Sequence, residues 1–330
     1  MFRQIKKYSS LIYFLCFGLI FSLILSGLDH SAVANSALLA QDAAVDAVGG
    51  VNQVNLFQAI VLGFVQGATE FIPISSTAHL KAIPVFLGWD DPGVSFTAVI
   101  QLGSIAAVIS YFWSDLSQIT IGMVKAIRHS NYESQDFWLA VGLALGSLPL
   151  IFAGLLLTIF EPPIYETVFR SMPSIAIVSI VMASLLALAE YVGNQKRNFE
   201  DLTVKDGVLI GLAQALAIIP GVSRSGSTMT ASLFNNIDRA SAARFSFLLG
   251  IPAITAAGLV GLKDLIDTGA GDAGFLPLIA GLISSTVFSY LAIAWLLEFL
   301  KRRSTWVFVW YRLGFGVFIL AAVALGWIKG

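Results

Sequence analysis

The chain has 330 residues, of which 57% are hydrophobic and 12% charged, and its formal net charge is −1. Soluble domains carry about 25% charged residues, so this composition, with a mean hydropathy of +0.83, indicates a polytopic helical membrane protein and excludes a soluble role. The chain lacks the basic face that nucleic-acid binding requires, and we expect no nucleic-acid partner. Cys16 is the only cysteine and His79 the only histidine in an apolar segment, which excludes an internal disulfide, a cysteine-based metal cluster and a three-histidine metal site.

The first 34 residues have the pattern of a secretory signal. Residues 1–10 carry basic side chains, 11–27 form an apolar run, and Ala32-Val33-Ala34 is a small-x-small cleavage pattern. We expect a signal peptide cleaved after Ala34, with a retained signal-anchor helix as the alternative. Residues 35–55 are small and polar, and are predicted to form an exterior linker.

Residues 56–88 follow as an apolar segment that proline interrupts. Pro73 cannot continue a helix, and it favours extended geometry at Ile72. The segment concentrates polar side chains around that point: Gln66, Thr69, Glu70, Ser75, Ser76, Thr77 and His79. The sequence therefore predicts a half-helix, a break and a second half-helix, with polar groups gathered at the break.

Helical spacing places these polar groups on common faces. Gln66 and Glu70 (i, i+4) share one face, and Ser76 and His79 (i, i+3) share a face of the following helix. Helix packing through small residues would explain the glycines and some hydroxyls of this stretch. It would not explain two ionisable side chains within an apolar segment, which are functional by default.

Six full spans are predicted beyond this segment, at 94–112, 137–159, 171–192, 245–262, 275–297 and 306–328. Four connections are basic and therefore predicted to be cytoplasmic; they carry Lys125 and Arg128; Lys196, Arg197 and Lys205; Arg239 and Arg244; and Lys301, Arg302 and Arg303. The first of these connections is interpreted as a loop. The opposite connections are acidic or neutral, with Asp90 and Asp91; Glu161 and Glu166; and Asp264, Asp267 and Asp272.

These charges set the predicted topology. The six crossings alternate consistently only if 56–88 enters from and returns to the exterior, and 207–235 enters from and returns to the cytoplasm. We therefore expect an all-α polytopic membrane protein with an inverted-topology repeat inside an integral membrane domain, 56–330. Repeat one spans 56–192 and repeat two 207–328, each a re-entrant helix-loop-helix followed by three transmembrane helices.

The second interrupted segment resembles the first. Both contain Gly-x-x-Gln, then Ile-Pro, then a serine three residues after the proline, Ser76 in one and Ser223 in the other. Paired interruptions in corresponding halves point to a site near the membrane midplane. Arg224 is interpreted as the only arginine in the core of an apolar segment, and its guanidinium fork matches phosphate oxygens. The alternative is a purely structural ion pair with Glu70.

The residue types indicate phosphoryl chemistry on a lipid. His79 can take or give a proton, Ser76 is a candidate nucleophile, and Glu70 can act as a base or hold a divalent cation. Glycines and hydroxyls around Arg224 open a helix whose N–H groups favour an anion. Beside the catalytic candidates Glu70, Ser76, His79 and Arg224, we expect substrate to be bound by Gln66, Ser75, Thr77, Ser223, Ser225, Gly226 and Thr228.

Two motifs make the chain resemble a known family. Residues 63–80 and 217–228, with the later Phe245-Ser-Phe-Leu-Leu-Gly-Ile-Pro252, are similar to the undecaprenyl-diphosphatase family, also called the bacitracin-resistance or BacA family. The resemblance extends over roughly 55–328. It implies an undecaprenyl-diphosphate phosphatase of the bacterial plasma membrane that regenerates the monophosphate carrier for cell-wall synthesis and confers bacitracin resistance.

By motif position, the resemblance places the functional residues at Gln66, Glu70, Ser76, His79, Ser223, Arg224 and Thr228. Two positions depart from the family's usual pattern: Gln66 stands where Glu is common, and Ala78 where Gly commonly precedes the histidine. The first change removes a charged metal ligand.

The remaining expectations concern ligands and partners. We expect Mg²⁺ or Ca²⁺ between Glu70 and the diphosphate of a polyprenyl lipid, because a lone carboxylate there faces a highly charged leaving group. Gln66 would add a neutral oxygen ligand. The protein offers too few ligands for a complete cage, so the diphosphate would have to supply others. We expect the site to open to the exterior, and we allow for a homodimer. The rival function is that of a transporter or flippase, since inverted repeats with broken helices are transporter architecture, but a carrier has no evident use for Ser76 and His79.

Overall fold

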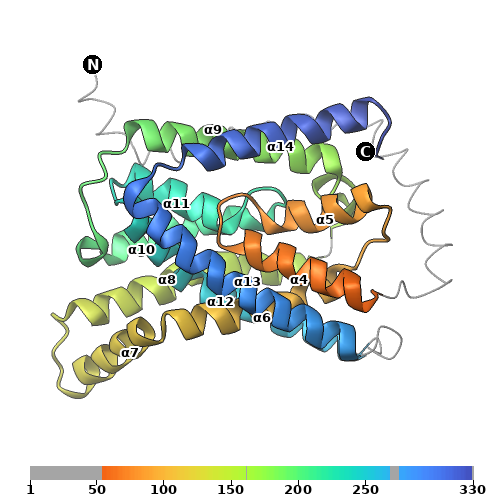
Figure 1. Cartoon of the computed structure of the whole chain (residues 1–330). Helices are drawn as coiled ribbons and strands as arrows, with labels where there is room; N and C mark the ends of the chain where they lie inside the picture. Colours follow the sequence, from red (N-terminus) through yellow and green to blue (C-terminus); the bar gives the residue numbers. More distant parts are fainter. Residues whose placement is uncertain (1–53, 161, 268–274, 329–330) are drawn as a thin grey trace. The chain divides into compact units, whose positions relative to one another are not determined.

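The computed structural model describes residues 54–160, 162–267 and 275–328 (Figure 1). The predicted signal segment, 1–34, and all but the last two residues of the predicted linker lie outside the described residues. Within the described ranges the chain is built from helices, and its only strand-like pairing is one isolated bridge between Arg197 and Ile237.

Both interrupted segments have the predicted form of two half-helices around a break. The first consists of α4 (Leu56–Glu70) and α5 (Ser76–Leu87), and the second of α10 (Val204–Ala215), the short 3₁₀ turn η4 (Leu216–Ile218) and α11 (Arg224–Phe234). Capping boxes start α4 at Asn55 and α10 at Thr203, which satisfies N–H groups that the first turn of a helix leaves free.

The serines that begin the second half-helices adopt the same unusual backbone. Ser75 is the N-cap of α5 with φ 75°, and Ser223 is the N-cap of α11 with φ 70°. Each follows its glutamine by nine residues, 66 to 75 and 214 to 223. The prediction that paired Ser76 with Ser223 is therefore wrong, because it counted from the proline, which stands one residue later in the first break.

Six helices are long and apolar enough to cross a membrane within the described residues. They are α6 (Val94–Tyr111), α8 (Gln135–Phe160), α9 (Met172–Val192), α12 (Arg239–Asp267), α13 (Phe275–Arg302) and α14 (Trp306–Ala324). Each coincides with a predicted span. Two helices are longer than the predicted spans: α12 begins six residues before 245, and α13 continues beyond 297 to Arg302. The added turns are polar but remain helical. The chain is thus an all-α multi-pass membrane protein.

The connection between the first two spans is helical, so its interpretation as a loop is wrong. It forms α7 (Trp113–Arg128), with Asp115 in the first turn and Lys125 and Arg128 in the last. That charge order complements the helix dipole. Helix α7 packs against α8, so the two helices form a hairpin with the basic residues Lys125 and Arg128 near its turn.

An ion pair fixes the start of α10. Asp206 accepts hydrogen bonds from Arg197 Nη1 at 2.8 Å and from Thr203 Oγ1 at 2.6 Å. Burial alone would raise the pKa of the Asp206 carboxyl, but the hydrogen bonds from Arg197 and Thr203 outweigh it and lower that pKa. The carboxylate of Asp206 therefore stays ionised. Through Arg197 it joins the second interrupted segment to the connection before it, which we predicted to be cytoplasmic.

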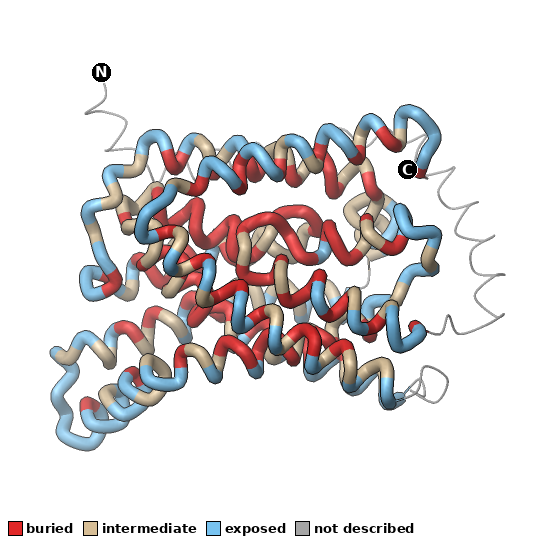
Figure 2. Tube along the Cα trace, in the orientation of Figure 1, coloured by how far each residue is buried: buried red, intermediate tan, exposed pale blue. Residues whose placement is uncertain are grey.

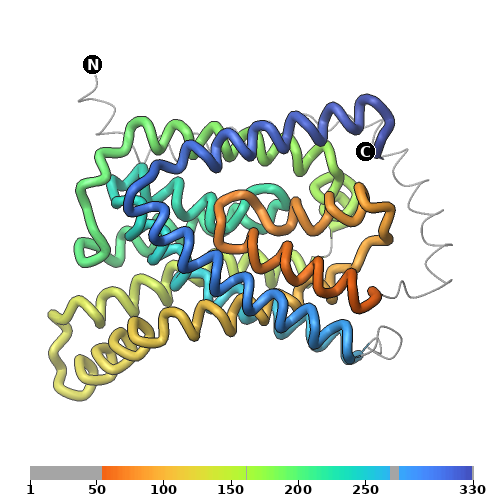
Figure 3. The backbone as a smooth tube through the Cα atoms, in the orientation of Figure 1, coloured from red at the N-terminus to blue at the C-terminus, as the bar shows by residue number. Residues whose placement is uncertain are grey.

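The interrupted segments pack inside the long helices. Helix α4 lies against α13, α10 lies against α8, and α9 lies beside α14 (Figures 1 and 3). Glycine allows the closest contacts: a Cβ on Gly63 would overlap the carbonyl of Gly281, and one on Gly211 would overlap that of Gly146. Every residue of α11 from Arg224 to Leu233 is buried (Figure 2). Pro220, Gly221 and Val222 of the break before it are buried as well, which is the condition under which irregular backbone is stable at membrane depth.

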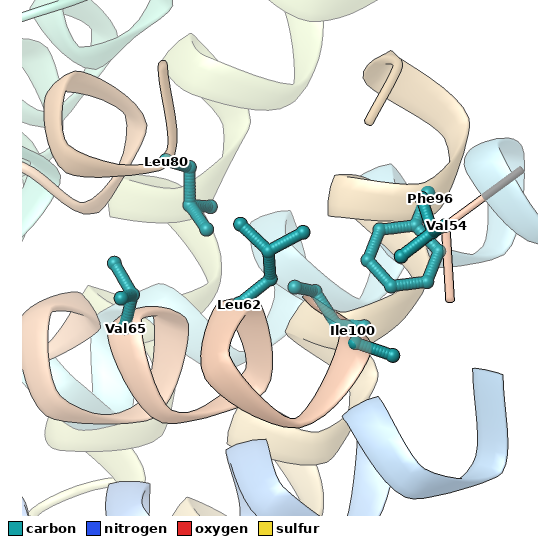
Figure 4. Packing of buried hydrophobic residues seen from close by; sticks show 7 residues of the cluster. Val54, Leu62, Val65, Leu80, Phe96 and Ile100 are labelled. Carbon is teal, nitrogen blue, oxygen red and sulfur yellow. The ribbon is translucent and has the colours of Figure 1, made fainter. Parts of the chain in front are cut away.

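Two apolar clusters hold α5 in place. One packs Leu62 and Val65 of α4, Leu80 of α5, and Phe96 and Ile100 of α6 together (Figure 4). The other joins α5 to α9 and α14 through Ala82, Met172, Ala176 and Ile319. Because α5 is packed on both sides, the polar residues in its first turn have fixed positions.

Candidate active site

The carboxylate of Glu70 is the centre of the site. It lies in the last turn of α4 and is 8% exposed. Its Oε2 accepts hydrogen bonds from Gln66 Nε2 at 3.0 Å and from Ser76 Oγ at 2.7 Å, and its Oε1 lies 3.4 Å from Arg224 Nη2. One carboxylate therefore joins α4, α5 and α11, and it brings together four of the predicted site residues.

Ser76 and His79 have different partners, although they lie one turn apart on α5. Ser76 donates to Glu70, whereas His79 contacts the carbonyl of Ser75 through Nδ1 at 2.8 Å and the hydroxyl of Tyr311 through Nε2 at 2.6 Å. The structure thus replaces the predicted Ser76–His79 pair with two pairs, Ser76–Glu70 and His79–Tyr311. The helical face was predicted correctly, but the partners come from α4 and α14.

Arg224 is buried between both interrupted segments and α12. Its guanidinium also donates to the carbonyl of Ser246 at 2.9 Å and lies 5.9 Å from the ring centroid of Phe71. Gly250 leaves room for it, because a Cβ there would overlap the guanidinium. The ion pair with Glu70 that we considered as an alternative does exist, but at 3.4 Å it is long for a charge-assisted hydrogen bond.

The predicted residues around Arg224 shape the start of α11. Ser223 Oγ accepts the N–H of Gly226 at 3.1 Å, and Ser225 Oγ donates to the carbonyl of Ile72 at 3.2 Å. Thr228 Oγ1 donates to the carbonyl of Arg224 at 2.8 Å. These hydroxyls hold the helix start and connect it to the first break.

The other two predicted residues on α5 are arranged differently. Ser75 occupies the N-cap position of α5 without a side-chain capping hydrogen bond, and it is buried with its carbonyl turned to His79. Thr77 is exposed, and within the described residues no hydrogen bond connects it to the cluster around Glu70. Its predicted role in substrate binding has no support from this arrangement.

Arg312 is a second arginine inside an apolar span, so the interpretation that Arg224 is the only one is wrong. It lies in α14 and is fully buried. Its guanidinium donates to Gly221 O at 2.7 Å, Val222 O at 3.1 Å and Pro73 O at 3.4 Å. No carboxylate of the described residues forms an ion pair with it. Arg312 thus connects the two breaks through their carbonyl oxygens.

Several buried polar atoms at the site have no hydrogen-bond partner in the protein. They include Gln66 Oε1 and Arg224 Nε, which belong to side chains already connected to Glu70. The same Nε2 of Gln66 that donates to Glu70 also donates to Ser104 Oγ at 3.4 Å, and Ser104 in turn contacts Ser285 and Ser289. Buried polar groups are rarely left unpaired, so these atoms are available to substrate, water or an ion.

The donor set limits how a metal ion could bind. Within the described residues, no group of three or more His, Cys, Asp or Glu side chains could hold a metal ion. Glu70 and the free oxygen of Gln66 offer two protein ligands. They fit an ion that completes its coordination with diphosphate and water, and they do not fit a permanent structural ion.

Comparison with known proteins assigns the chain to a family. The model of the family described as bacitracin resistance protein BacA matches residues 59–318. The chain belongs to this BacA family. That match includes every residue of the site described above, from Gln66 to Arg312.

Close relatives in the BacA family carry an enzyme name. A protein named undecaprenyl-diphosphatase from Synechocystis is 60% identical over 295 residues, 89% of this chain and 90% of the relative. Relatives with the same name from Nostoc and Synechococcus elongatus are 61% and 55% identical, covering 84% and 86% of this chain and 87% and 98% of their own lengths.

Sequence reasoning missed three residues of this BacA site. Arg312 had a usable signal, since a charged residue within an apolar span is expected to be functional or internally paired. Ser246 stands in the Phe245-Ser246-Phe247 motif, but its carbonyl is what binds Arg224, and no side-chain pattern indicates that. Tyr311 precedes Arg312 and has no signal of its own, because tyrosines are common at membrane interfaces.

The structure predicts that Arg312 stabilises the two breaks. Arg312→Lys keeps the charge but cannot reach several carbonyls at once, and we expect it to lower stability by about 3 kcal/mol or more through lost charged hydrogen bonds. The measurement is the melting temperature of the purified protein in detergent. Arg303→Lys, at an exposed position after α13, is the matched control and should melt like the wild type. Equal melting of the two variants would show that Arg312 does not hold the breaks.

Proposed function

We propose that this protein is an undecaprenyl-diphosphatase, which removes the terminal phosphate of undecaprenyl diphosphate and so recycles the lipid carrier for peptidoglycan synthesis. The observation that supports it most is the buried cluster of Glu70, Ser76 and Arg224, which unites a base, a nucleophile and an anion-binding group. The names of the 55–61% identical relatives agree with this chemistry. Resistance to bacitracin, the property in the family's description, is the expected consequence in the cell.

The geometry favours Ser76 over His79 as the nucleophile. Ser76 Oγ already donates to a carboxylate at 2.7 Å, which is the contact required between a nucleophile and its base. Both nitrogens of His79 are engaged elsewhere. In the first step, Ser76 Oγ bonds to the terminal phosphorus, the bond to the bridging oxygen breaks, and undecaprenyl phosphate leaves with the electron pair. Glu70 takes the serine proton.

The second step returns the enzyme to its initial state. Water attacks the phosphorus of phosphoserine, the bond from phosphorus to Ser76 Oγ breaks, and Glu70 returns its proton to the serine. We assign the water's proton to His79, one helical turn from Ser76. Throughout, the fork of Arg224 stabilises charge on the phosphoryl oxygens.

We also propose the inverted repeat as the architecture of the site. In this correspondence α4, α5, α6, α8 and α9 match α10, α11, α12, α13 and α14. The helix contacts support it: α4 with α13 corresponds to α10 with α8, α6 with α13 corresponds to α12 with α8, and α6 with α12 and α9 with α14 each join a helix to its own counterpart. With basic connections in the cytoplasm of a bacterium, Glu70 and Ser76 then open to the exterior of the plasma membrane.

A divalent cation completes the proposal. Mg²⁺ or Ca²⁺ would be held by Glu70 and Gln66 Oε1 together with the diphosphate, and it would neutralise charge on the phosphate oxygens. The free, buried Oε1 of Gln66 supports this assignment. With so few protein ligands, affinity in the absence of substrate should be weak.

Phosphate release by the wild type and by Arg224→Lys tests both the phosphatase activity and the binding of the phosphoryl group by Arg224. Purified wild-type protein in detergent should release phosphate from undecaprenyl diphosphate, whereas a transporter or flippase should release none. Lysine keeps the charge but loses the fork, so we expect normal folding and a loss of about a hundredfold in turnover, the scale for one lost oxyanion donor. Near-normal turnover with a lower melting temperature would instead make Arg224 a structural partner of Glu70.

Removal of metal tests the cation. Exhaustive chelation should abolish phosphate release, and added Mg²⁺ or Ca²⁺ should restore it, because the two protein oxygens leave the ion exchangeable. The measurement is turnover before and after chelation. Undiminished activity after chelation would remove the ion from the reaction.

Cysteine labelling tests the orientation. Asp91 is exposed between α5 and α6, and Glu133 is exposed beyond α7. In a Cys16→Ser background, a membrane-impermeant maleimide added to intact cells should label Asp91→Cys and leave Glu133→Cys unlabelled. The reverse pattern would place the site on the cytoplasmic side.

A further inference from the structure

The two contacts of His79 determine which nitrogen carries the hydrogen. The carbonyl of Ser75, 2.8 Å from Nδ1, can only accept a hydrogen bond, so Nδ1 carries the hydrogen. In the neutral ring Nε2 is then an acceptor, and the phenol of Tyr311, 2.6 Å away, donates to it. The only lone pair of the imidazole therefore faces the Tyr311 hydroxyl.

The rings of α14 hold His79 in this orientation. The imidazole stacks on Phe315 with ring centroids 4.4 Å apart and planes 9° apart, and on Tyr311 at 5.6 Å and 13°. Tyr311 and Phe315 are one helical turn apart, so they form a continuous face. The ring of His79 cannot turn its Nε2 elsewhere without losing both stacks and the hydrogen bond to Ser75.

Exposure distinguishes the two members of the pair. His79 is 5% exposed and Tyr311 46% exposed. The carboxylates on the neighbouring helices have other partners. Glu70 of α4 contacts Ser76, Gln66 and Arg224, and Glu190, the only carboxylate of α9, binds Arg239 and Thr305. Lys81 lies on α5, the helix that carries His79. Arg312 of α14 binds carbonyl oxygens of the two breaks. No carboxylate of the described residues is bonded to the ring, so a proton reaches Nε2 through the phenol.

We propose that Tyr311 relays the proton between the reacting water and His79. This inference rests on the proposed phosphatase function and assigns its second step. As water bonds to the phosphorus of phosphorylated Ser76, its proton passes to the phenol oxygen while the phenol's own proton passes to Nε2. The products are phosphate, neutral Tyr311 and the imidazolium of His79, which returns its proton to solvent along the same path.

Tyr311→Phe removes the hydroxyl and keeps the stacked ring. The expected result is a loss of about a hundredfold in kcat, the scale of general acid–base catalysis, with the melting temperature nearly unchanged and KM lowered in proportion, because the intact first step leaves kcat/KM as in the wild type. Because the first step is intact, undecaprenyl phosphate should appear in a rapid burst, and phosphate should remain bound to Ser76, detectable by mass spectrometry. His79→Gln should give the same burst, and the double variant should be no slower than His79→Gln.

Two further variants separate a relay from packing. Tyr290→Phe removes a phenol of nearly equal exposure, 45% against 46% for Tyr311, on α13, and it should retain wild-type turnover. Phe315→Leu weakens the stack without touching the relay, and it should lose much less activity than Tyr311→Phe. Wild-type kcat in Tyr311→Phe, or an equal loss without a burst in Phe315→Leu, would overturn the relay.

A measurement that needs no turnover keeps this inference separate from the proposed function. Nitrogen-15 NMR of the labelled histidines in detergent, with His79 assigned from the His79→Gln spectrum, should show hydrogen on Nδ1 and a hydrogen-bonded, unprotonated Nε2 that changes in Tyr311→Phe. Hydrogen on Nε2 would overturn the relay even in an active phosphatase. Absence of phosphate release by the wild type would reject the function, whatever the spectrum shows.

Discussion

The buried carboxylate of Glu70 is the group on which the rest of the site depends. An ionised carboxylate away from water is stable only when its oxygens are well satisfied, and Glu70 receives Gln66, Ser76 and Arg224 from three helices. Each donor is held in turn by its own helix. The half-helices α4, α5 and α11 are therefore kept in register by a charge that none of them could bury alone, and a broken helix is what allows three such groups to converge.

The two buried arginines, Arg224 and Arg312, bind different groups. Each break leaves carbonyl oxygens without helical partners, and such groups are costly at membrane depth. Arg312 satisfies three of them, and its Nε contacts Ser179 Oγ. Arg224 instead shares a long contact with Glu70 and leaves its Nε unpaired. The structure thus assigns one guanidinium to the backbone and leaves the other with capacity for an anion.

The sequence predicted the helices better than it predicted the contacts between them. Spans and breaks follow from apolar runs and prolines, which act locally, and both were predicted closely. Helix α7 was missed because its charges were interpreted as a loop, although Asp115 at its start and Arg128 at its end suit a helix. The Ser76–His79 pair was wrong for a different reason. Spacing fixes which residues share a face of α5, but the neighbours of that face, Glu70 and Tyr311, depend on how distant segments pack.

The division of partners along α5 also explains why one short helix can serve both steps of the proposed reaction. Ser76 in its first turn faces the carboxylate of Glu70, so the group that must lose a proton to attack lies against an acceptor. His79, one turn later, faces the phenol of Tyr311, and the neutral imidazole has its acceptor nitrogen, Nε2, on that side. If both residues faced the same carboxylate, protonation of one would alter the other. Packing α5 between α4 on one side and α14 on the other keeps the two proton acceptors, Glu70 and His79, apart, although Ser76 and His79 lie only one helical turn from each other.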